Sequence, residues 1–301
     1  MTYPPAGVGA SSAREWSCVT ASRAELAPTN AAFAAKSLAL CPRAVRGFTL
    51  VELVMVIALA GVVAVLISTV MSNPLQSFVD QSRRAELVDL AAGALNRMAR
   101  DVRLAVPNSL VHSGDTIQML SIANAGRYRA NQPDASGARQ DPPACSATGL
   151  CTIDVLTPIT PLSTTTPHWL IIYNTNTTEL DDTASPSVIS PKAFTWSGGS
   201  LSATLPGFRF KYASPQHRFY LANEVVGYRC DGGGRLWRSV SPNLDGSGAT
   251  ESLLVNSVSA CSFSYASATN TRSGLLTIRL SLTQDDETIT LLQQVHVDNA
   301  P

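Results

Sequence analysis

The sequence predicts an α+β fold in which one long N-terminal helix packs on an antiparallel β-sheet domain. Three observations lead to this prediction. An apolar run of 25 residues, Phe48 to Ser72, contains a single charged residue, Glu52. An amphipathic helical pattern follows the run, and beyond it short stretches of alternating apolar and polar residues are separated by turn residues. A helical segment followed by a run of strands is typical of α+β domains, because α/β folds alternate the two.

The apolar run is long enough to cross a membrane. As a helix, its length is about 37 Å, more than the roughly 30 Å of a bilayer's hydrocarbon core. A buried core helix is the alternative, but one that is apolar on every face would need a large surrounding domain. Arg43 and Arg46 precede the run and place the N-terminus in the cytoplasm by the positive-inside rule. We therefore expect the residues after the run to lie across the membrane.

The segment before the run, residues 1–47, contains scattered prolines and no sustained periodicity. This composition predicts a poorly ordered cytoplasmic leader. Residues 48–72 would then form the transmembrane half of the helix and residues 73–106 its amphipathic half. Residues 107–301 would form a β-rich globular domain.

The amphipathic half has apolar residues at helical spacings of three and four. Pro74 is expected to kink the helix without ending it, and Pro107 with Asn108 marks the stop. The residues expected on the buried face are Leu87, Leu90, Ala91, Ala94, Leu95, Met98 and Val102.

Beyond the helix, period-two patterns predict short strands, joined as hairpins by turn chemistry at Ser214–Gln216 and Asp231–Gly234. The stretch between Ala123 and Ser200 is rich in Thr, Asn, Pro and Ser, and we expect mostly long surface loops there. The predicted strands are Thr116–Ser121, Trp169–Tyr173, Phe208–Tyr212, Arg218–Ala222, Val225–Cys230, Leu236–Val240, Cys261–Tyr265, Leu275–Leu282 and Thr288–Val297.

Residues 46–53, RGFTLVEL, stand at the start of the apolar run. They resemble the cleavage and methylation motif of type IV prepilins, in which a small residue precedes an N-terminal Phe and a Glu stands four residues after that Phe. The resemblance implies a type IV pilin-like fold. It also implies that a membrane-bound prepilin peptidase cuts after Gly47 and methylates the new amine of Phe48. Partners would be other major and minor pilin subunits and an inner-membrane assembly platform.

Segments beyond the motif narrow the resemblance. Residues 78–89, 97–103 and 107–109, and later 217–221 and 228–231, resemble minor pilins of mannose-sensitive haemagglutinin (MSHA) pilus biogenesis, the O component. The J-type minor pseudopilins of type II secretion are similar in layout. This resemblance implies a minor subunit that primes or caps a pilus fibre, anchored in the inner membrane by one span with its C-terminal domain in the periplasm. A type II secretion subunit and a pilus-tip adhesin are the alternatives.

Two residues of the motif have a physical reason to be there. Gly47 leaves the backbone accessible and extended in a tight protease cleft. A carboxylate such as Glu52 costs about 2.5–3.5 kcal/mol at the centre of a membrane helix and less near the interface. It could simply reach the headgroups, but the resemblance gives it a partner, the cationic amine of a neighbouring subunit's Phe48.

The six cysteines divide by compartment. Cys18 and Cys41 would stay in the reducing cytoplasm, whereas Cys145, Cys151, Cys230 and Cys261 would face an oxidising periplasm. Four cysteines allow three pairings, and we expect Cys145–Cys151 to close a short loop and Cys230–Cys261 to tie two strands together. A zinc site is the alternative, but the spacings lack paired C-x-x-C.

We find no constellation that supports catalysis, and we expect no enzyme activity, cofactor, metal or nucleic-acid partner. Apolar residues make up 45% of the chain and charged residues 15%, the formal net charge is zero, and no basic stripe stands out. Asn243, Asp245 and Ser247 could ligate calcium, but no bidentate Glu follows and a turn is favoured. Ordinary signal-peptidase cleavage before Asn73 would instead release a secreted protein, which the length of the run and Glu52 argue against. The four histidines stand far apart in the sequence: His112, His168, His217 and His296. The two runs of acidic residues are expected to be solvated turn charges: Asp181-Asp182 and Asp285-Asp286-Glu287.

Overall fold

The computed structural model describes residues 47–133, 137, 139–156, 165–197, 199–269 and 272–301. The leader expected at residues 1–47 thus lies outside the described residues except for Gly47. The chain divides into two compact units, one up to Gly61 and one from Val62 onward.

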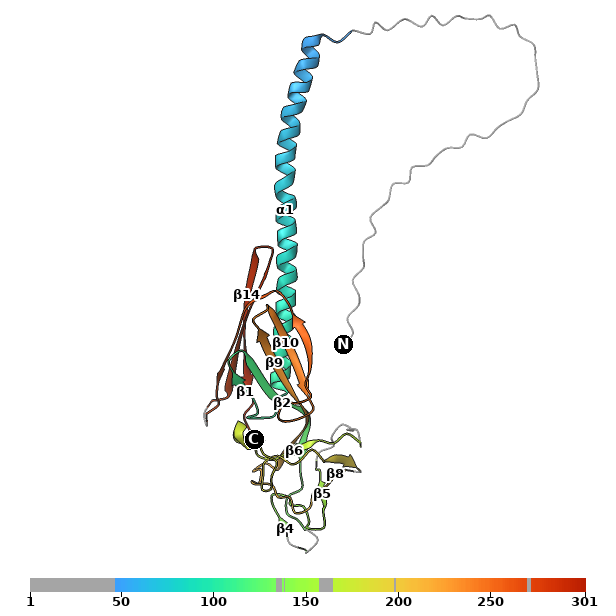
Figure 1. Ribbon diagram of the computed structural model, residues 1–301, viewed down its shortest axis with the longest axis vertical. Coiled ribbons are helices and arrows are strands. Elements are labelled where there is room, and N and C mark those ends of the chain that lie inside the picture. The colour runs from blue at the N-terminus through green and yellow to red at the C-terminus, as the bar shows by residue number, and fades with distance from the viewer. Residues whose placement is uncertain (1–46, 134–136, 138, 157–164, 198, 270–271) are drawn as a thin grey trace, which may run out of the picture. The chain divides into compact units, whose positions relative to one another are not determined.

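A single helix, α1, extends from Leu50 to Arg103 and continues through Pro74 (Figure 1). It ends three residues before the expected limit of 106 because the next residues join a sheet. The backbone of Leu104 accepts a hydrogen bond from Ile122, Ala105 bridges Ser121, and Val106 donates to Leu120.

The buried face of α1 agrees with the sequence pattern except at Leu90, which is 43% exposed. Leu90 was therefore wrongly placed on the core face. Its spacing of three from Leu87 fits the apolar stripe, but it lies at the edge of that stripe, next to the buried Ala91. Ala99, which the pattern did not single out, is buried instead. The other buried positions are those expected: Leu87, Ala91, Ala94, Leu95, Met98 and Val102.

Two antiparallel sheets pack with the second half of α1. The first has the order β1-β2-β9-β10-β11, with β6 also paired to β9, and the second has the order β12-β13-β14. The strands of the first sheet are β1 (Val111–Ser113), β2 (Thr116–Arg127), β6 (Trp169–Ile171), β9 (Arg218–Asp231), β10 (Arg235–Ser241) and β11 (Thr250–Val255). Those of the second are β12 (Val258–Ala266), β13 (Gly274–Gln284) and β14 (Glu287–Val297).

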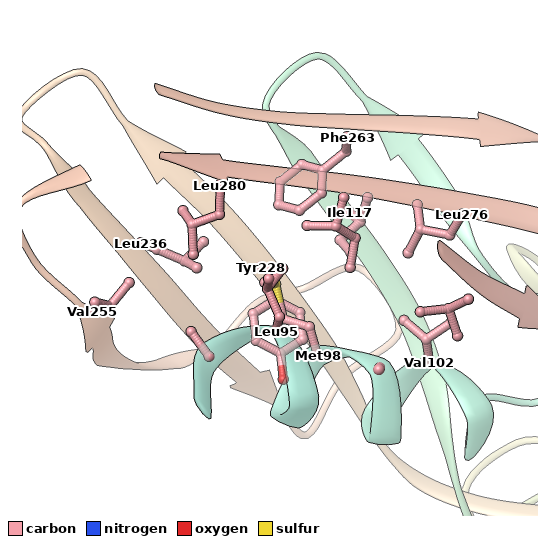
Figure 2. Close-up of a cluster of buried hydrophobic side chains, with 14 of the residues drawn as sticks. Leu95, Met98, Val102, Ile117, Tyr228, Leu236, Val255, Phe263, Leu276 and Leu280 are labelled. Carbon is pink, nitrogen blue, oxygen red and sulfur yellow. The ribbon is translucent and has the colours of Figure 1, made fainter. Parts of the chain in front are cut away.

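The main core lies where α1 and the two sheets meet (Figure 2). Leu95, Met98 and Val102 on α1 meet apolar side chains from strands of both sheets. Each strand contributes alternate residues, as a pleated sheet with one buried face requires. The sheet residues labelled in Figure 2 are Ile117, Tyr228, Leu236, Val255, Phe263, Leu276 and Leu280.

A long insertion, residues 128–217, separates β2 from β9, although these two strands are neighbours. It contains the remaining short elements and contributes to two apolar clusters, one around Phe194 and one around Trp169 and Ile171, both of which also include residues of β9. The expectation of mostly surface loops between Ala123 and Ser200 was wrong, because residues of this segment are buried in these clusters. Its elements are β3 (Gln132–Pro133), β4 (Arg139–Gln140), β5 (Leu150–Asp154), β6, the 3₁₀ helix η1 (Thr177–Leu180), β7 (Thr195–Ser197) and β8 (Ser200–Thr204).

Three further strand predictions need correction. Arg218–Ala222 and Val225–Cys230 are not two strands but the single strand β9, because register shifts in its ladder with β2 absorb the intervening residues. Phe208–Tyr212 is not a strand, since only isolated bridges form there, Arg209 with Ala144 and Phe210 with Ser187. β11 was not foreseen, since four of its six residues are exposed and it lacks the alternation of a half-buried strand.

Candidate processing and assembly site

The motif residues lie at the start of α1, where Thr49 caps the helix. The backbone N–H of Glu52 donates to Oγ1 of Thr49 at 3.2 Å, and the N–H of Leu53 donates to the Thr49 carbonyl at 3.1 Å. A Thr followed three residues later by Glu is the sequence pattern of a capping box, and its Thr49 half satisfies a donor that the first turn would otherwise leave free. Thr49 and Glu52 therefore also define where the helix begins.

Gly47 and Phe48 form an exposed, non-helical segment directly before the cap. The Phe48 side chain is 75% exposed, and a Cβ at Gly47 would meet nothing within 4 Å. The fold of the chain itself thus leaves room for a larger residue at position 47. A requirement for glycine there must come from an outside partner that reads the backbone, such as a protease cleft.

The helix that follows is apolar on its whole circumference. Residues Leu50–Val70 have a mean hydropathy of 2.9, and none of this span is buried against the protein. This degree of exposure excludes a core helix within the described part of the chain. An exposed apolar helix of 21 residues fits a membrane anchor.

Glu52 brings a carboxylate into the first turn of this apolar helix. A negative charge there is favoured by the helix dipole. None of the ion pairs among the described residues includes Glu52. The carboxylate is thus available to a cation from outside the described chain.

The four later cysteines are joined in two disulfides. Cys145–Cys151 closes a loop of six residues' separation within the insertion, with the two Cα atoms 4.5 Å apart. Cys230–Cys261 joins β9 of the first sheet to β12 of the second, with Cα atoms 6.2 Å apart. The second bond thus links the two sheets that pack with α1.

The remaining candidate groups lie in separate structural settings. The loop containing Asn243, Asp245 and Ser247 is closed on itself, because Ser247 N–H donates to Asp245 at 2.9 Å and Asn243 Nδ2 donates to Ser247. His168 is buried, and burial lowers its pKa. Among the described residues, no group of three or more His, Cys, Asp or Glu side chains could hold a metal ion.

Sequence reasoning missed two features. The capping box was visible as Thr-x-x-Glu but was absorbed into the processing motif. The acidic hairpin turn is exposed, as expected, but it also pairs with α1, because Asp285 lies 3.3 Å from Arg83 and Glu287 lies 3.6 Å from Arg84. These ion pairs place the tip of the β13–β14 hairpin against α1, and no local signal in the sequence predicts such a distant pairing.

An exposed apolar helix, capped directly after an exposed Gly-Phe segment, fits a chain anchored in a membrane near its N-terminal end. Residues 42–68 match the family model described as the prokaryotic N-terminal methylation motif. The match indicates a type IV pilin-like or pseudopilin-like protein, anchored in the inner membrane and processed by prepilin peptidase. No significant match was found among curated proteins or among solved structures.

Proposed function

We propose that this chain is a minor pilin that primes or caps assembly of a type IV pilus fibre of the MSHA type, with no enzymatic role. One observation carries the proposal: a capped, fully exposed apolar helix begins two residues after Phe48, within the methylation motif. Cleavage after Gly47 would leave the amine of Phe48 next to the first turn of that helix. The domain after the helix would lie in the periplasm, where the cysteines of its two disulfides can be oxidised.

The pairing of charges gives the assembly role its physical basis. An ammonium group without a partner is costly among packed apolar helices, and removing one partner of a buried pair typically costs about 3–5 kcal/mol. Glu52 lies in the first turn and has no cation of its own among the described residues. It can neutralise the Phe48 amine of an adjacent subunit and so fix the axial stagger between the two.

Two other roles remain alternatives. A minor pseudopilin of type II secretion would use the same motif and helix. A pilus-tip adhesin is favoured by the insertion of residues 128–217, because the two apolar clusters to which it contributes contain no residue of α1. Restoring pilus assembly in a pilus-gene deletion strain, but not secretion in a secretion-gene deletion strain, separates the first role from the second.

Mass spectrometry of the mature N-terminus tests the proposal. We expect methylated Phe48, and Gly47→Leu should leave the chain uncut, whereas the matched control Gly93→Ala should be processed normally. Both glycines have open space around the position of a Cβ, so neither change is expected to disturb the fold. A mature chain that begins at Asn73, or an uncut chain in cells with active peptidase, would contradict the proposal.

A further inference from the structure

The β14 strand presents a long unpaired edge. It pairs with β13 over 11 consecutive residue pairs without a register shift, and no other described strand pairs with it. The two-residue turn Asp285-Asp286, with both φ angles positive, closes the ladder at Gln284 and Glu287. In such a ladder, alternate residues direct their backbone N–H and C=O groups away from the partner strand. The residues that face outward on β14 are therefore Thr288, Thr290, Leu292, Gln294 and His296, all with exposed side chains.

This edge lacks the features by which proteins prevent strands from adding to a sheet. Lysine, proline, a bulge or a short edge strand usually serve that purpose. Between Thr288 and Val297 the strand has no Lys, Arg, Asp, Glu or Pro, and Leu292 is 62% exposed at its centre. Register shifts interrupt the ladders β2–β9 and β12–β13, whereas the ladder β10–β11 is regular from Thr250 to Leu253 and shifts only beyond that residue. An open edge of this kind is suited to strand addition by a partner.

The direction of β14 relative to α1 limits which strand can be added. β14 begins where Glu287 pairs with Arg84 and ends near Asn108, whose Oδ1 accepts a 2.7 Å hydrogen bond from Asn299. It therefore extends in the same direction as residues 84–103 of α1. Copies anchored in one membrane have parallel α1 helices, so two β14 edges could meet only as parallel strands, which is the slightly less stable geometry.

The strand β11, at one edge of the first sheet, runs the opposite way. Within β9, Val225 pairs with Leu120 beside the end of α1, and the strand then returns along α1 to Tyr228, which contacts Asp101. β10 is antiparallel to β9 and β11 is antiparallel to β10, so β11 also runs opposite to α1. β11 of one copy and β14 of another are thus antiparallel when both helices emerge from the same membrane.

We propose that β14 is an assembly surface to which β11 of a second copy of this chain adds as an antiparallel strand. The chain carries both free edges, with the directions that such pairing requires. The contact joins different surfaces of the two copies, so a pair formed in this way still has one free β14 edge and one free β11 edge. This inference rests on the proposed anchoring and assembly role but adds a contact between domains to the contact between helices.

Cysteine crosslinking between two differently tagged full-length copies in one membrane tests the pairing. One copy carries Thr290→Cys and the other Ser252→Cys, both at exposed positions of the two edges. We expect a mixed-tag crosslinked dimer with a short bismaleimide reagent. The matched control is Arg279→Cys, exposed on the central strand β13, where strands flank the residue on both sides. Three results would each overturn the proposal. They are equal crosslinking yields for Thr290→Cys and Arg279→Cys, crosslinks only between two Thr290→Cys copies, and the absence of any crosslinked dimer.

A second variant tests the edge itself. Thr290→Pro removes an outward N–H that the β13 ladder does not use, so the fold should persist while crosslinking from Thr288→Cys falls roughly tenfold. If the proline variant does not fold, Leu292→Lys is used in its place, because it puts a charge on the same edge. This variant should lower the crosslinking yield by the same factor. Normal cleavage after Gly47 and normal pilus assembly together with absent crosslinks would overturn strand pairing alone. Loss of cleavage in the unsubstituted chain would overturn the proposed function instead.

Discussion

The hydroxyl of Tyr228 on β9 donates a hydrogen bond of 2.6 Å to Oδ2 of Asp101 on α1. Nε of Arg238 on β10 donates to the same oxygen at 2.9 Å. Asp101 lies in the last turn of α1, where the helix dipole disfavours a negative charge, and Arg238 offsets that charge. Burial and the neighbouring carboxylate raise the pKa of Tyr228, which keeps the hydroxyl protonated as a donor. These three side chains anchor the end of α1 to the first sheet.

We predict that removing this anchor destabilises the domain after the membrane span. Tyr228→Phe should lower the free energy of unfolding by about 1 kcal/mol, the usual net contribution of one hydrogen bond. Asp101→Ala leaves Arg238 without its partner in a half-buried site and should cost roughly 3 kcal/mol. Denaturant unfolding measures both changes, and a double-mutant cycle gives the coupling between Tyr228 and Asp101.

The matched control for Tyr228→Phe is Tyr212→Phe, which removes a hydroxyl from a more exposed ring. We expect its effect to stay within about 0.5 kcal/mol, as is usual for surface substitutions. Equal effects at positions 212 and 228 would show that Tyr228 does not anchor α1.

The anchor also shows where sequence reasoning ends. The apolar run, the amphipathic stripe and the strands of the second sheet follow from periodicity, because each pattern is local. Asp101 and Tyr228 are 127 residues apart, and nothing near either residue indicates the other. For the same reason the sequence predicts loops in the insertion, because its short apolar segments form clusters only when they pack with one another and with β9. The motif at Gly47, Phe48 and Glu52 can be recognised because its residues lie close together in the sequence. The role of Thr49 as a helix cap did not follow from the motif.

A second prediction concerns pH. His168 is 3% exposed, and burial lowers its pKa below the ordinary value of 6.5, with a further lowering from the nearby charge of Lys192. The neutral ring is therefore favoured in the folded state, and the unfolded chain takes up a proton first. Stability should be complete above pH 6.5 and fall as the pH drops below that value, with a slope of at most about 1.4 kcal/mol per pH unit from this group.

Urea unfolding of the purified domain measures this slope. The pH is varied from 7.5 to 5, a range chosen to include the ordinary histidine pKa of 6.5. His168→Gln should reduce the slope, whereas His296→Gln, at an exposed position of β14, should leave it unchanged. A slope that is the same in the His168→Gln variant and the unsubstituted domain would contradict the assignment.

The third prediction concerns the two disulfides. Closing a loop of 31 residues' separation should stabilise the domain by about 3–4 kcal/mol in the chain-entropy model, and closing the shorter Cys145–Cys151 loop by about 2 kcal/mol. Replacing both Cys230 and Cys261 by Ser should therefore lower the melting temperature more than the same change at the other pair. Free thiols at all four positions in periplasmically expressed protein would contradict the pairing, and thermal unfolding with thiol titration decides the matter.

The last prediction separates the two roles of Glu52. As the third residue of α1 it supports the capping box, and as a carboxylate in an apolar helix it can pair with the Phe48 amine of a neighbouring subunit. Glu52→Gln keeps a side chain that suits the capping box and removes only the charge. Thr49→Ala removes the cap and keeps the charge, and loss of such a cap costs about 1 kcal/mol of helix stability.

If charge pairing drives assembly, Glu52→Gln should be cleaved, methylated and inserted normally but should fail to crosslink with its pilin partners. Thr49→Ala should fray the start of the helix yet keep most of its crosslinking, because the carboxylate is still present. The stability of the domain after Val62 should change in neither variant, since both positions lie in the first unit of the chain. Mass spectrometry of the N-terminus, membrane fractionation and complementation of a deletion strain give the three readouts. The charge-pairing role would be contradicted if Glu52→Gln assembled pili at the wild-type level while Thr49→Ala lost pilus assembly. That result would mean that the helix cap matters for assembly and the charge of Glu52 does not.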